Sequence, residues 1–237
     1  MGSEVIMESP AIFYVPHQDD EILQMGVAIM NHVYHSQEVH LVLCTNGNAL
    51  NSYAKRVLNG ISICGWHKTK HKFHLTDEEY IRARNHEFVW SSMCMKVKPE
   101  NIHFRQYIDG ALSVDNAKYI IAEFEKTYPG ARHKTMSYTD PHRDHAALGE
   151  ALYQLYAEKY VNDVRFYIDT MQMDKIDGYY EPVKKEFMPY LRRSNNVYKS
   201  FVPNNNLYAI GYHSVPEWFK KQFKRPRSKY HKPEDYK

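Results

Sequence analysis

Two segments of the chain concentrate histidine and aspartate at close spacing. The first reads His17-Gln18-Asp19-Asp20-Glu21, and the second reads Thr139-Asp140-Pro141-His142-Arg143-Asp144-His145. Imidazole and carboxylate groups are ligands of catalytic zinc, which takes three protein ligands and keeps one position for water. Two neutral imidazoles and one carboxylate leave a net positive charge, which helps lower the pKa of bound water towards about 7. The two segments therefore predict a metal site that activates water.

The segments offer more ligands than one zinc ion needs: His17, Asp19, Asp20, His142 and His145. Within each segment two candidates are three residues apart, so at a helix start they can point the same way. The surplus groups would serve as base and electrophile. Two alternatives stay open, because aspartates at such positions are commonly helix caps and the histidines could be ordinary surface residues.

Each segment follows a predicted strand and opens a predicted helix. Residues 11–16 are apolar and aromatic, as in a buried strand, and the apolar residues between 22 and 33 recur at helical spacing. Further strands are predicted at 39–44, 101–104, 135–138 and 164–169. Further helices are predicted at 76–95, where Thr76 and Glu79 form a capping box, and at 116–127, 146–160, 183–192 and 216–223. Residues 49–75 resemble an inserted loop or lid.

Alternating strands and helices predict an α/β fold with a mostly parallel sheet. In such sheets ligands bind beyond the carboxyl ends of the strands, where the strand order switches. Both His/Asp segments would lie at that edge, so we expect them to share one site.

Length and composition restrict the other possibilities. A chain of 237 residues is consistent with one domain, which we place at residues 1–225, with a basic and flexible tail at 226–237. Residues 218–237 carry a net charge of +6, which leaves −3 for the rest of a chain of net +3. We therefore expect no nucleic-acid binding, since that needs a basic face.

Apolar stretches, targeting signals and cysteines indicate where the protein is expected to be located. No apolar stretch approaches the ~20 residues of a membrane span, and no signal peptide is visible. The three cysteines, Cys44, Cys64 and Cys94, form no CxxC motif, which argues against a disulfide framework or a cysteine zinc site. We expect a cytoplasmic protein, with secretion as the alternative if a signal has been removed.

The two motifs resemble those of the PIG-L (LmbE-like) family of zinc-dependent N-acetylglucosamine-type deacetylases. That family carries an HPDDE-like motif after its first strand and an HxDH-like motif before a later helix. Residues 45–47 (Thr-Asn-Gly), together with Arg84 and Glu87, extend the resemblance over roughly residues 11–160. The chain departs from the family pattern at Gln18 and Arg143, where proline is usual.

The resemblance implies a Rossmann-like three-layer fold and a role for each site residue. His17, Asp20 and His145 would bind the metal. Asp19 would be the general base, and a protonated His142 would stabilise the oxyanion. Asp144 would orient a neighbouring histidine, and Arg84 would reach the substrate.

The implied function is a zinc-dependent hydrolase that removes an acetyl group from an N-acetylated amino sugar or sugar conjugate, with Fe(II) as an alternative metal. The expected partner is this small molecule, and the oligomeric state stays open. Competing hypotheses are another metal-dependent α/β hydrolase such as a phosphoesterase, a non-haem Fe(II) oxygenase and a non-catalytic sugar-binding relative.

Overall fold

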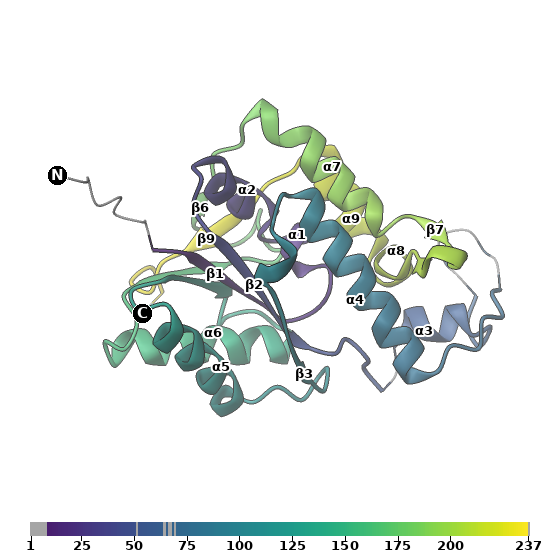
Figure 1. The fold of residues 1–237 in the computed structure, drawn as a ribbon, viewed down its shortest axis with the longest axis horizontal. Helices are drawn as coiled ribbons and strands as arrows, with labels where there is room; N and C mark the ends of the chain where they lie inside the picture. Colours follow the sequence, from purple (N-terminus) through teal and green to yellow (C-terminus); the bar gives the residue numbers. More distant parts are fainter. Residues whose placement is uncertain (1–8, 51, 64, 66–67, 69, 237) are drawn as a thin grey trace.

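A mostly parallel sheet forms the centre of the computed structural model, which describes residues 9–50, 52–63, 65, 68 and 70–236 (Figure 1). Its strands are β1 (Ala11–Val15), β2 (Val39–Thr45), β3 (Ile102–Tyr107), β4 (Arg132–Met136), β5 (Asp163–Tyr167), β6 (Tyr179–Tyr180) and β9 (Lys229–His231). Their order is β3-β2-β1-β4-β5-β9-β6. β1 to β5 run parallel, and β9 is antiparallel to β5 and β6. A separate small sheet pairs β7 (Phe201–Val202) with β8 (Leu207–Tyr208).

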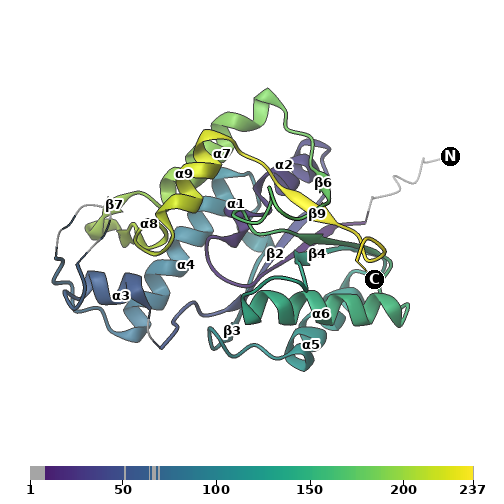
Figure 2. The ribbon, with the colours of Figure 1, turned by 180° about the vertical axis from the view of Figure 1, so that it is seen from behind.

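Helices cover both faces of the sheet, as the two opposite views show (Figures 1 and 2). They are α1 (Asp20–Leu23), α2 (Gly26–Tyr34), α3 (Tyr53–Leu58), α4 (Asp77–Cys94), α5 (Val114–Thr127), α6 (Arg143–Ala157), α7 (Met188–Val197), α8 (Ile210–Ser214) and α9 (Pro216–Lys224). Short 3-10 turns occupy Pro99–Asn101, Lys185–Phe187 and Pro203–Asn205. The predicted α/β fold, a three-layer arrangement around a mostly parallel sheet, is confirmed.

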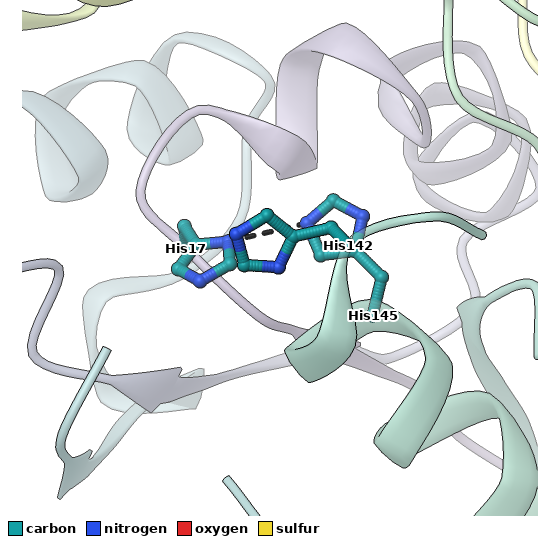
Figure 3. Close-up of side chains that lie close together, drawn as sticks. All are labelled: His17, His142 and His145. Carbon is teal, nitrogen blue, oxygen red and sulfur yellow. Dashed lines mark hydrogen bonds between the residues drawn. The ribbon is translucent and has the colours of Figure 1, made fainter. Parts of the chain in front are cut away.

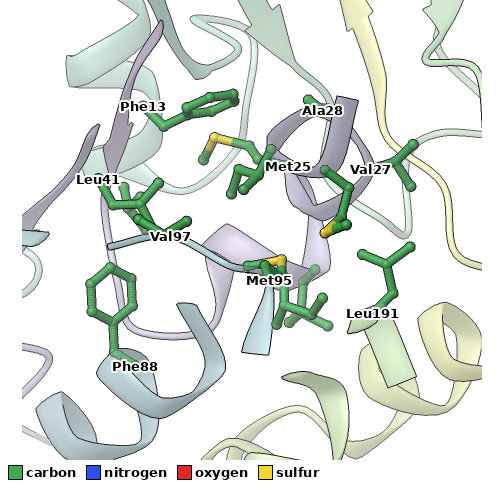
Figure 4. Packing of buried hydrophobic residues seen from close by; sticks show 14 of the residues in the cluster. Phe13, Met25, Val27, Ala28, Leu41, Phe88, Met95, Val97 and Leu191 are labelled. Atoms are coloured by element: carbon green, nitrogen blue, oxygen red, sulfur yellow. The ribbon is translucent and has the colours of Figure 1, made fainter. Parts of the chain in front are cut away.

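The two faces of the sheet have separate cores. Phe13 and Leu41 pack against α2, α4 and α7 on one face, with Met25, Phe88 and Leu191 among their neighbours (Figure 4). Tyr14 and Val42 of the same strands face α5 and α6 on the other side. Every residue of β1 and β2 is buried, as expected for parallel strands that are covered on both faces.

The predicted helix after the first His/Asp segment is interrupted. α1 ends at Leu23 and α2 begins at Gly26, so Gln24 and Met25 lie at a break. The apolar residues keep helical spacing across this break, which explains why periodicity predicts one helix. A Cβ on Gly26 would lie 2.9 Å from Ile22 Cδ1, so glycine at this position lets the side chain of Ile22 pack closely against the start of the second helix.

The expected loop or lid at residues 49–75 is only partly correct. In the described part of this segment, α3 packs against α8, and Ala54, Leu58 and Leu75 join Tyr80 and Ile210 in a small apolar cluster. The capping box that starts α4 is confirmed: Glu79 N–H donates to Thr76 Oγ1 (3.2 Å) and Thr76 N–H donates to Glu79 Oε2 (2.9 Å).

The expected flexible tail is wrong, because its residues complete the sheet. β9 pairs with β5, with Phe166 opposite His231. His231 is buried, and its Nε2 lies 2.7 Å from Ser137 Oγ. Lys229 bonds through Nζ to the carbonyl oxygens of Met173 (3.0 Å) and Ile176 (2.5 Å). The basic composition of this segment concealed β9, in which the side chain of Lys229 bonds to backbone carbonyl oxygens. A domain boundary at residue 225 would leave this strand out of the domain.

In the part of the chain that the structure describes, no helix has the length and apolar character needed to cross a bilayer. Cys44 and Cys94 are free thiols there. Cys64 and the first eight residues, which bear on the expected location, lie outside the described residues.

Candidate metal and catalytic site

The order in which the chain adds strands reverses between β1 and β4, and both His/Asp segments follow these two strands. β1 and β4 are adjacent, while the strands that follow each of them in the chain lie on opposite sides. The carboxyl end of β1 leads to His17, and the carboxyl end of β4 leads to His142 and His145. A cavity of 390 Å³ opens between the two loops and is lined by all three histidines. Both His/Asp segments therefore line one cavity, at the edge of the sheet where the sequence places them.

Three atoms from the two loops form a nearly equilateral triangle. His17 Nδ1 lies 3.1 Å from His145 Nε2 and 3.3 Å from Asp20 Oδ2, and His145 Nε2 lies 3.2 Å from the same oxygen. A tetrahedral zinc ion with bonds of about 2.0–2.1 Å needs ligand atoms about 3.3–3.4 Å apart. The donor types and their spacing thus fit a zinc ion, although the same set also suits other first-row divalent metals.

Carboxylates set the tautomer of both histidines. His17 Nε2 lies 3.0 Å from Asp144 Oδ2 and 3.2 Å from Asp109 Oδ1, so in the neutral ring this nitrogen carries the proton and Nδ1 keeps its lone pair. His145 Nδ1 lies 3.3 Å from Asp140 Oδ2, which leaves the lone pair on Nε2. Such outer carboxylates fix the orientation of metal-binding histidines and raise their basicity.

The electrostatics of the triangle favour a bound cation. Burial alone would lower the pKa of His17, but its hydrogen bonds to Asp109, Asp144 and Asp20 hold that pKa well above the ordinary value. Burial would also lower the pKa of His145, but the negative charge of Asp20 raises it to about 9. Burial would raise the pKa of Asp20, yet His145 and His17 hold it well below its usual range. Without a metal ion, protons bound to His17 and His145 thus balance the negative charge of the nearby carboxylates.

Asp19 does not act as a helix cap, since its side chain accepts no capping hydrogen bond. Its backbone has a φ of 118°, a conformation that L-residues rarely adopt. Strain of this kind is typical of functional sites. The side chain lines the cavity, 3.7 Å from Arg84 Nη2. Burial raises the pKa of Asp19 to about 7, although the charge of Arg84 opposes this shift.

Arg84 is buried in the cavity wall by contacts with two loops. Its Nη1 donates to Gly47 O (2.7 Å) and its Nη2 donates to Gln18 O (2.8 Å). Gly47 has a φ of +67°, and a Cβ there would lie 1.9 Å from Gln18 Oε1 and 2.9 Å from Arg84 Nη1. The Thr-Asn-Gly turn therefore needs its glycine to let Arg84 approach.

His142 is exposed at the mouth of the cavity, and its ring centroid lies 4.6 Å from that of His17 and 4.8 Å from that of His145 (Figure 3). Its Nδ1 accepts from Asp144 N–H (3.3 Å), so the neutral ring carries its proton on Nε2. Burial and the neighbouring His17 and His145 lower the pKa of His142. The protonated form of His142 that the family resemblance implies would have to overcome both effects.

Sequence reasoning missed two residues that contact His17 and His145. Asp140 stands inside the second motif but received no role. Asp109 follows β3, and that strand extends to Tyr107, three residues beyond its predicted end. An Asp-Gly pair just beyond a parallel strand is the signal that would have placed Asp109 at the same edge of the sheet.

The sequence of this chain matches the pattern of one known family. The sequence pattern of the PIG-L family, described as GlcNAc-PI de-N-acetylase, matches residues 12–156, more than half of the chain. The chain belongs to the PIG-L family. The match spans both His/Asp loops and Arg84, whereas part of the cavity wall, including Asp169 and Trp218, lies beyond the matched residues. Among curated proteins, none matches the chain with significance.

Solved structures share the fold of this PIG-L chain at low sequence identity. A deacetylase of the teicoplanin biosynthetic pathway matches with a TM-score of 0.66 and 15% identity, over 94% of this chain and 96% of its own. N,N'-diacetylchitobiose deacetylase from Pyrococcus horikoshii matches with a TM-score of 0.55 and 17% identity, over 84% and 76%. The 4-carboxy-2-hydroxymuconate hydratase from Pseudomonas putida matches with a TM-score of 0.55 and 14% identity, over 88% and 84%. The fold therefore accompanies more than one reaction.

Proposed function

We propose that this PIG-L protein is a zinc-dependent hydrolase that removes the acetyl group from an N-acetylated amino sugar or sugar conjugate. The observation that carries the proposal is the triangle of His17 Nδ1, Asp20 Oδ2 and His145 Nε2, with edges of 3.1–3.3 Å, beside a buried Asp19 in one cavity. The family description supplies the sugar and the acetyl group.

His17, Asp20 and His145 would hold the metal. When bound, zinc would supply positive charge that polarises an amide carbonyl and lowers the pKa of water. The carboxylates of Asp109, Asp144 and Asp140 keep the two imidazoles in the required tautomers.

Asp19 serves as the general base. Its carboxylate takes a proton from the water that attacks the acetyl carbon, and it returns the proton to the amine nitrogen as the C–N bond breaks. One water is consumed, and acetate and the amine are released, with the second proton of the water passing from the acetic acid to the amine to give an ammonium group. A base is most effective when its pKa lies near the working pH, and the pKa of Asp19 at about 7 meets this condition.

His142 stabilises the oxyanion that forms when water attacks. A neutral imidazole with its proton on Nε2 can donate to that oxygen without a charge of its own. Donors of this kind are typically worth about 2.7–4 kcal/mol in the transition state. Arg84 Nη2 lies 3.7 Å from Asp19 Oδ2, and its positive charge favours the carboxylate form of Asp19.

Hydration of a double bond is the second candidate, since a hydratase shares the fold. The deciding experiment loads the protein with zinc or Fe(II) and follows acetate release from N-acetylglucosamine and its conjugates. Parallel assays follow phosphate release from sugar phosphates and hydration of an unsaturated dicarboxylate. Acetate release alone supports the proposal, and turnover confined to either parallel assay overturns it.

A further inference from the structure

The strained backbone of Asp19 is held by hydrogen bonds on both of its sides. Its φ of 118° and ψ of −26° lie in the left-handed region. Its N–H donates to Glu21 Oε2 (3.0 Å), and its carbonyl oxygen accepts from the N–H groups of Ile22 (3.2 Å) and Leu23 (2.9 Å). Strained backbone persists only where the surrounding structure fixes it. Of these three bonds, the one to Glu21 depends on a side chain and can be removed by substitution.

The side chain of Glu21 reaches Asp19 from the protein interior. It is fully buried, and Glu21 is not among the described residues that line the cavity. Its Oε1 accepts from Ser91 Oγ (2.5 Å) on α4 and from Tyr198 Oη (2.8 Å), which follows α7. Ser91 Oγ in turn lies 2.7 Å from Ser194 Oγ on α7. The carboxylate that binds Asp19 N–H is therefore fixed from two helices behind the cavity.

A general role in helix stability does not account for this arrangement. Acidic residues are common in the first turn of a helix, because they offset the positive end of the helix dipole, and an exposed side chain is enough for that. Burying a carboxylate costs free energy unless hydrogen bonds compensate for the lost water. The hydrogen bonds of Glu21 are directed to one hydroxyl on α4, one hydroxyl after α7 and the N–H of Asp19. They connect the Asp19 backbone to the core.

The adjacent residue, Asp20, has a support of its own. Its Oδ2 accepts from His17 N–H at 3.0 Å. This bond lies within residues 17–20 and includes no atom of Glu21. Loss of the Glu21 carboxylate should therefore release Asp19 and leave the proposed metal ligand Asp20 in place, so the two roles can be separated by experiment.

We propose that Glu21 is the positioning residue of the general base. The inference deepens the proposed function and rests on it. α4 and α7 fix the carboxylate of Glu21, this carboxylate fixes the backbone of Asp19, and the Asp19 side chain then lies in the cavity wall beside the metal triangle. A base acts only within hydrogen-bond reach of the proton, and a misplacement of about 1 Å can cost about 100-fold in rate.

The first test compares turnover with metal binding. Glu21→Leu removes the acceptor, whereas Glu21→Gln keeps one oxygen for Asp19 N–H and turns its amide group towards the oxygens of Ser91 and Tyr198. We expect Glu21→Leu to lower kcat for acetate release about 10–100-fold, with unchanged zinc affinity in a chelator competition. Glu21→Gln should recover most of this kcat. Equal loss of kcat in both variants, or a loss of zinc that accompanies it, overturns the inference.

Glu181→Leu is the matched control for the loss of a buried carboxylate. Glu181 Oε1 accepts from Tyr167 Oη (2.8 Å) and Arg165 Nη1 (2.7 Å), and Glu181 is not among the described residues that line the cavity. Both leucine variants should lower the urea midpoint, but Glu181→Leu should leave kcat unchanged. A similar fall in kcat in the two variants would mean that the loss follows from general destabilisation, which contradicts a positioning role.

The second test examines the backbone of Asp19 without any assay of activity. Asp19→Gly and Asp19→Ala both remove the carboxylate, but only alanine keeps the Cβ that a φ of 118° disfavours. With Glu21 present, Asp19→Gly should have the higher urea midpoint of the two. After Glu21→Leu the segment can relax, so the difference between the two midpoints should shrink. An identical difference with and without Glu21 would show that Glu21 does not hold this conformation.

The two tests separate this inference from the proposed function. If the unsubstituted protein releases no acetate, or Asp19→Asn keeps normal turnover, the proposed function fails, and the urea midpoints still decide whether Glu21 fixes Asp19. If acetate release depends on Asp19 but is the same after Glu21→Leu, the proposed function stands and the positioning role is wrong.

Discussion

His145 Nε2 lies 3.2 Å from Asp20 Oδ2, although the two residues belong to loops that follow different strands. The contact exists because β1 and β4 are neighbours in the sheet and both end at the same edge. Each residue has a second contact that fixes its position. Asp20 Oδ2 accepts from His17 N–H (3.0 Å), and His145 Nδ1 lies 3.3 Å from Asp140 Oδ2. These fixed positions support the proposal that the pair holds a metal ion.

The outer carboxylate of His145 provides a first prediction. Asp140→Asn should weaken zinc binding about 10–100-fold, because the ring loses the charge that fixes its tautomer. Competition with a chromogenic chelator measures this. Asp115→Asn is the control, since Asp115 is exposed on α5, away from the cavity. Equal zinc affinity in the two variants would show that Asp140 has no such role.

Gly47→Ala tests whether the Thr-Asn-Gly turn positions Arg84. The new Cβ would meet Gln18 Oε1 and Arg84 Nη1, so Arg84 must shift and kcat/KM should fall at least tenfold. Gly130→Ala is the control, because Gly130 also has a positive φ (+75°) and its nearest neighbour, Ser9 Oγ, is 3.9 Å away. Both should lose about 1–2 kcal/mol of stability through backbone strain. If both variants keep full activity, the turn does not position Arg84.

The sequence allowed the five parallel strands, the helices next to them and both motif loops to be predicted, because burial and helical spacing repeat clearly there. The rest depends on contacts that periodicity does not encode. Gln24, which donates to Asp169 Oδ2, lies where the helix breaks although the apolar pattern continues. Asp109 reaches His17 from a strand with mixed burial and no clear alternation. β9 was hidden by the charge of Lys229, whose ammonium group is paired with carbonyl oxygens far away in the sequence.

Lys134 should make stability depend on pH in the alkaline range. Its ammonium group is buried on β4, 3.7 Å from Asp163 Oδ1, and burial lowers the pKa of Lys134 to about 8. The unfolded lysine binds its proton up to about pH 10.4, so the unfolded state holds more protons between about pH 8 and 10 and stability rises with pH there.

Lys134→Met removes the ammonium group and with it this pH-dependent contribution to stability. The free energy of unfolding of the unsubstituted protein should rise relative to the variant by up to about 3 kcal/mol across the window. Urea unfolding of both proteins at pH 7, 8, 9 and 10 measures the difference. Parallel pH curves for the two proteins would contradict the prediction.

Truncation after Arg225 tests the structural role of the C-terminal residues. It removes β9, which pairs with both β5 and β6 and buries His231. The free energy of unfolding should fall by more than about 3 kcal/mol, as for other losses of buried contacts. The double variant Lys220→Ser with Lys224→Ser removes surface charge without the strand and should stay within about 0.5 kcal/mol. A truncated chain with unchanged stability in urea would show that β9 is dispensable.

The most direct measurement combines zinc content and acetate release in three proteins: the unsubstituted chain, Asp19→Asn and His145→Ala. The unsubstituted chain should bind one zinc ion per chain and release acetate from an N-acetylated amino sugar. Asp19→Asn should keep the zinc and lose about 10²–10⁴-fold in kcat, the usual contribution of a general base. His145→Ala should lose both. Near-normal turnover by Asp19→Asn, or full zinc content in His145→Ala, would contradict the assignment of the base or of the metal site.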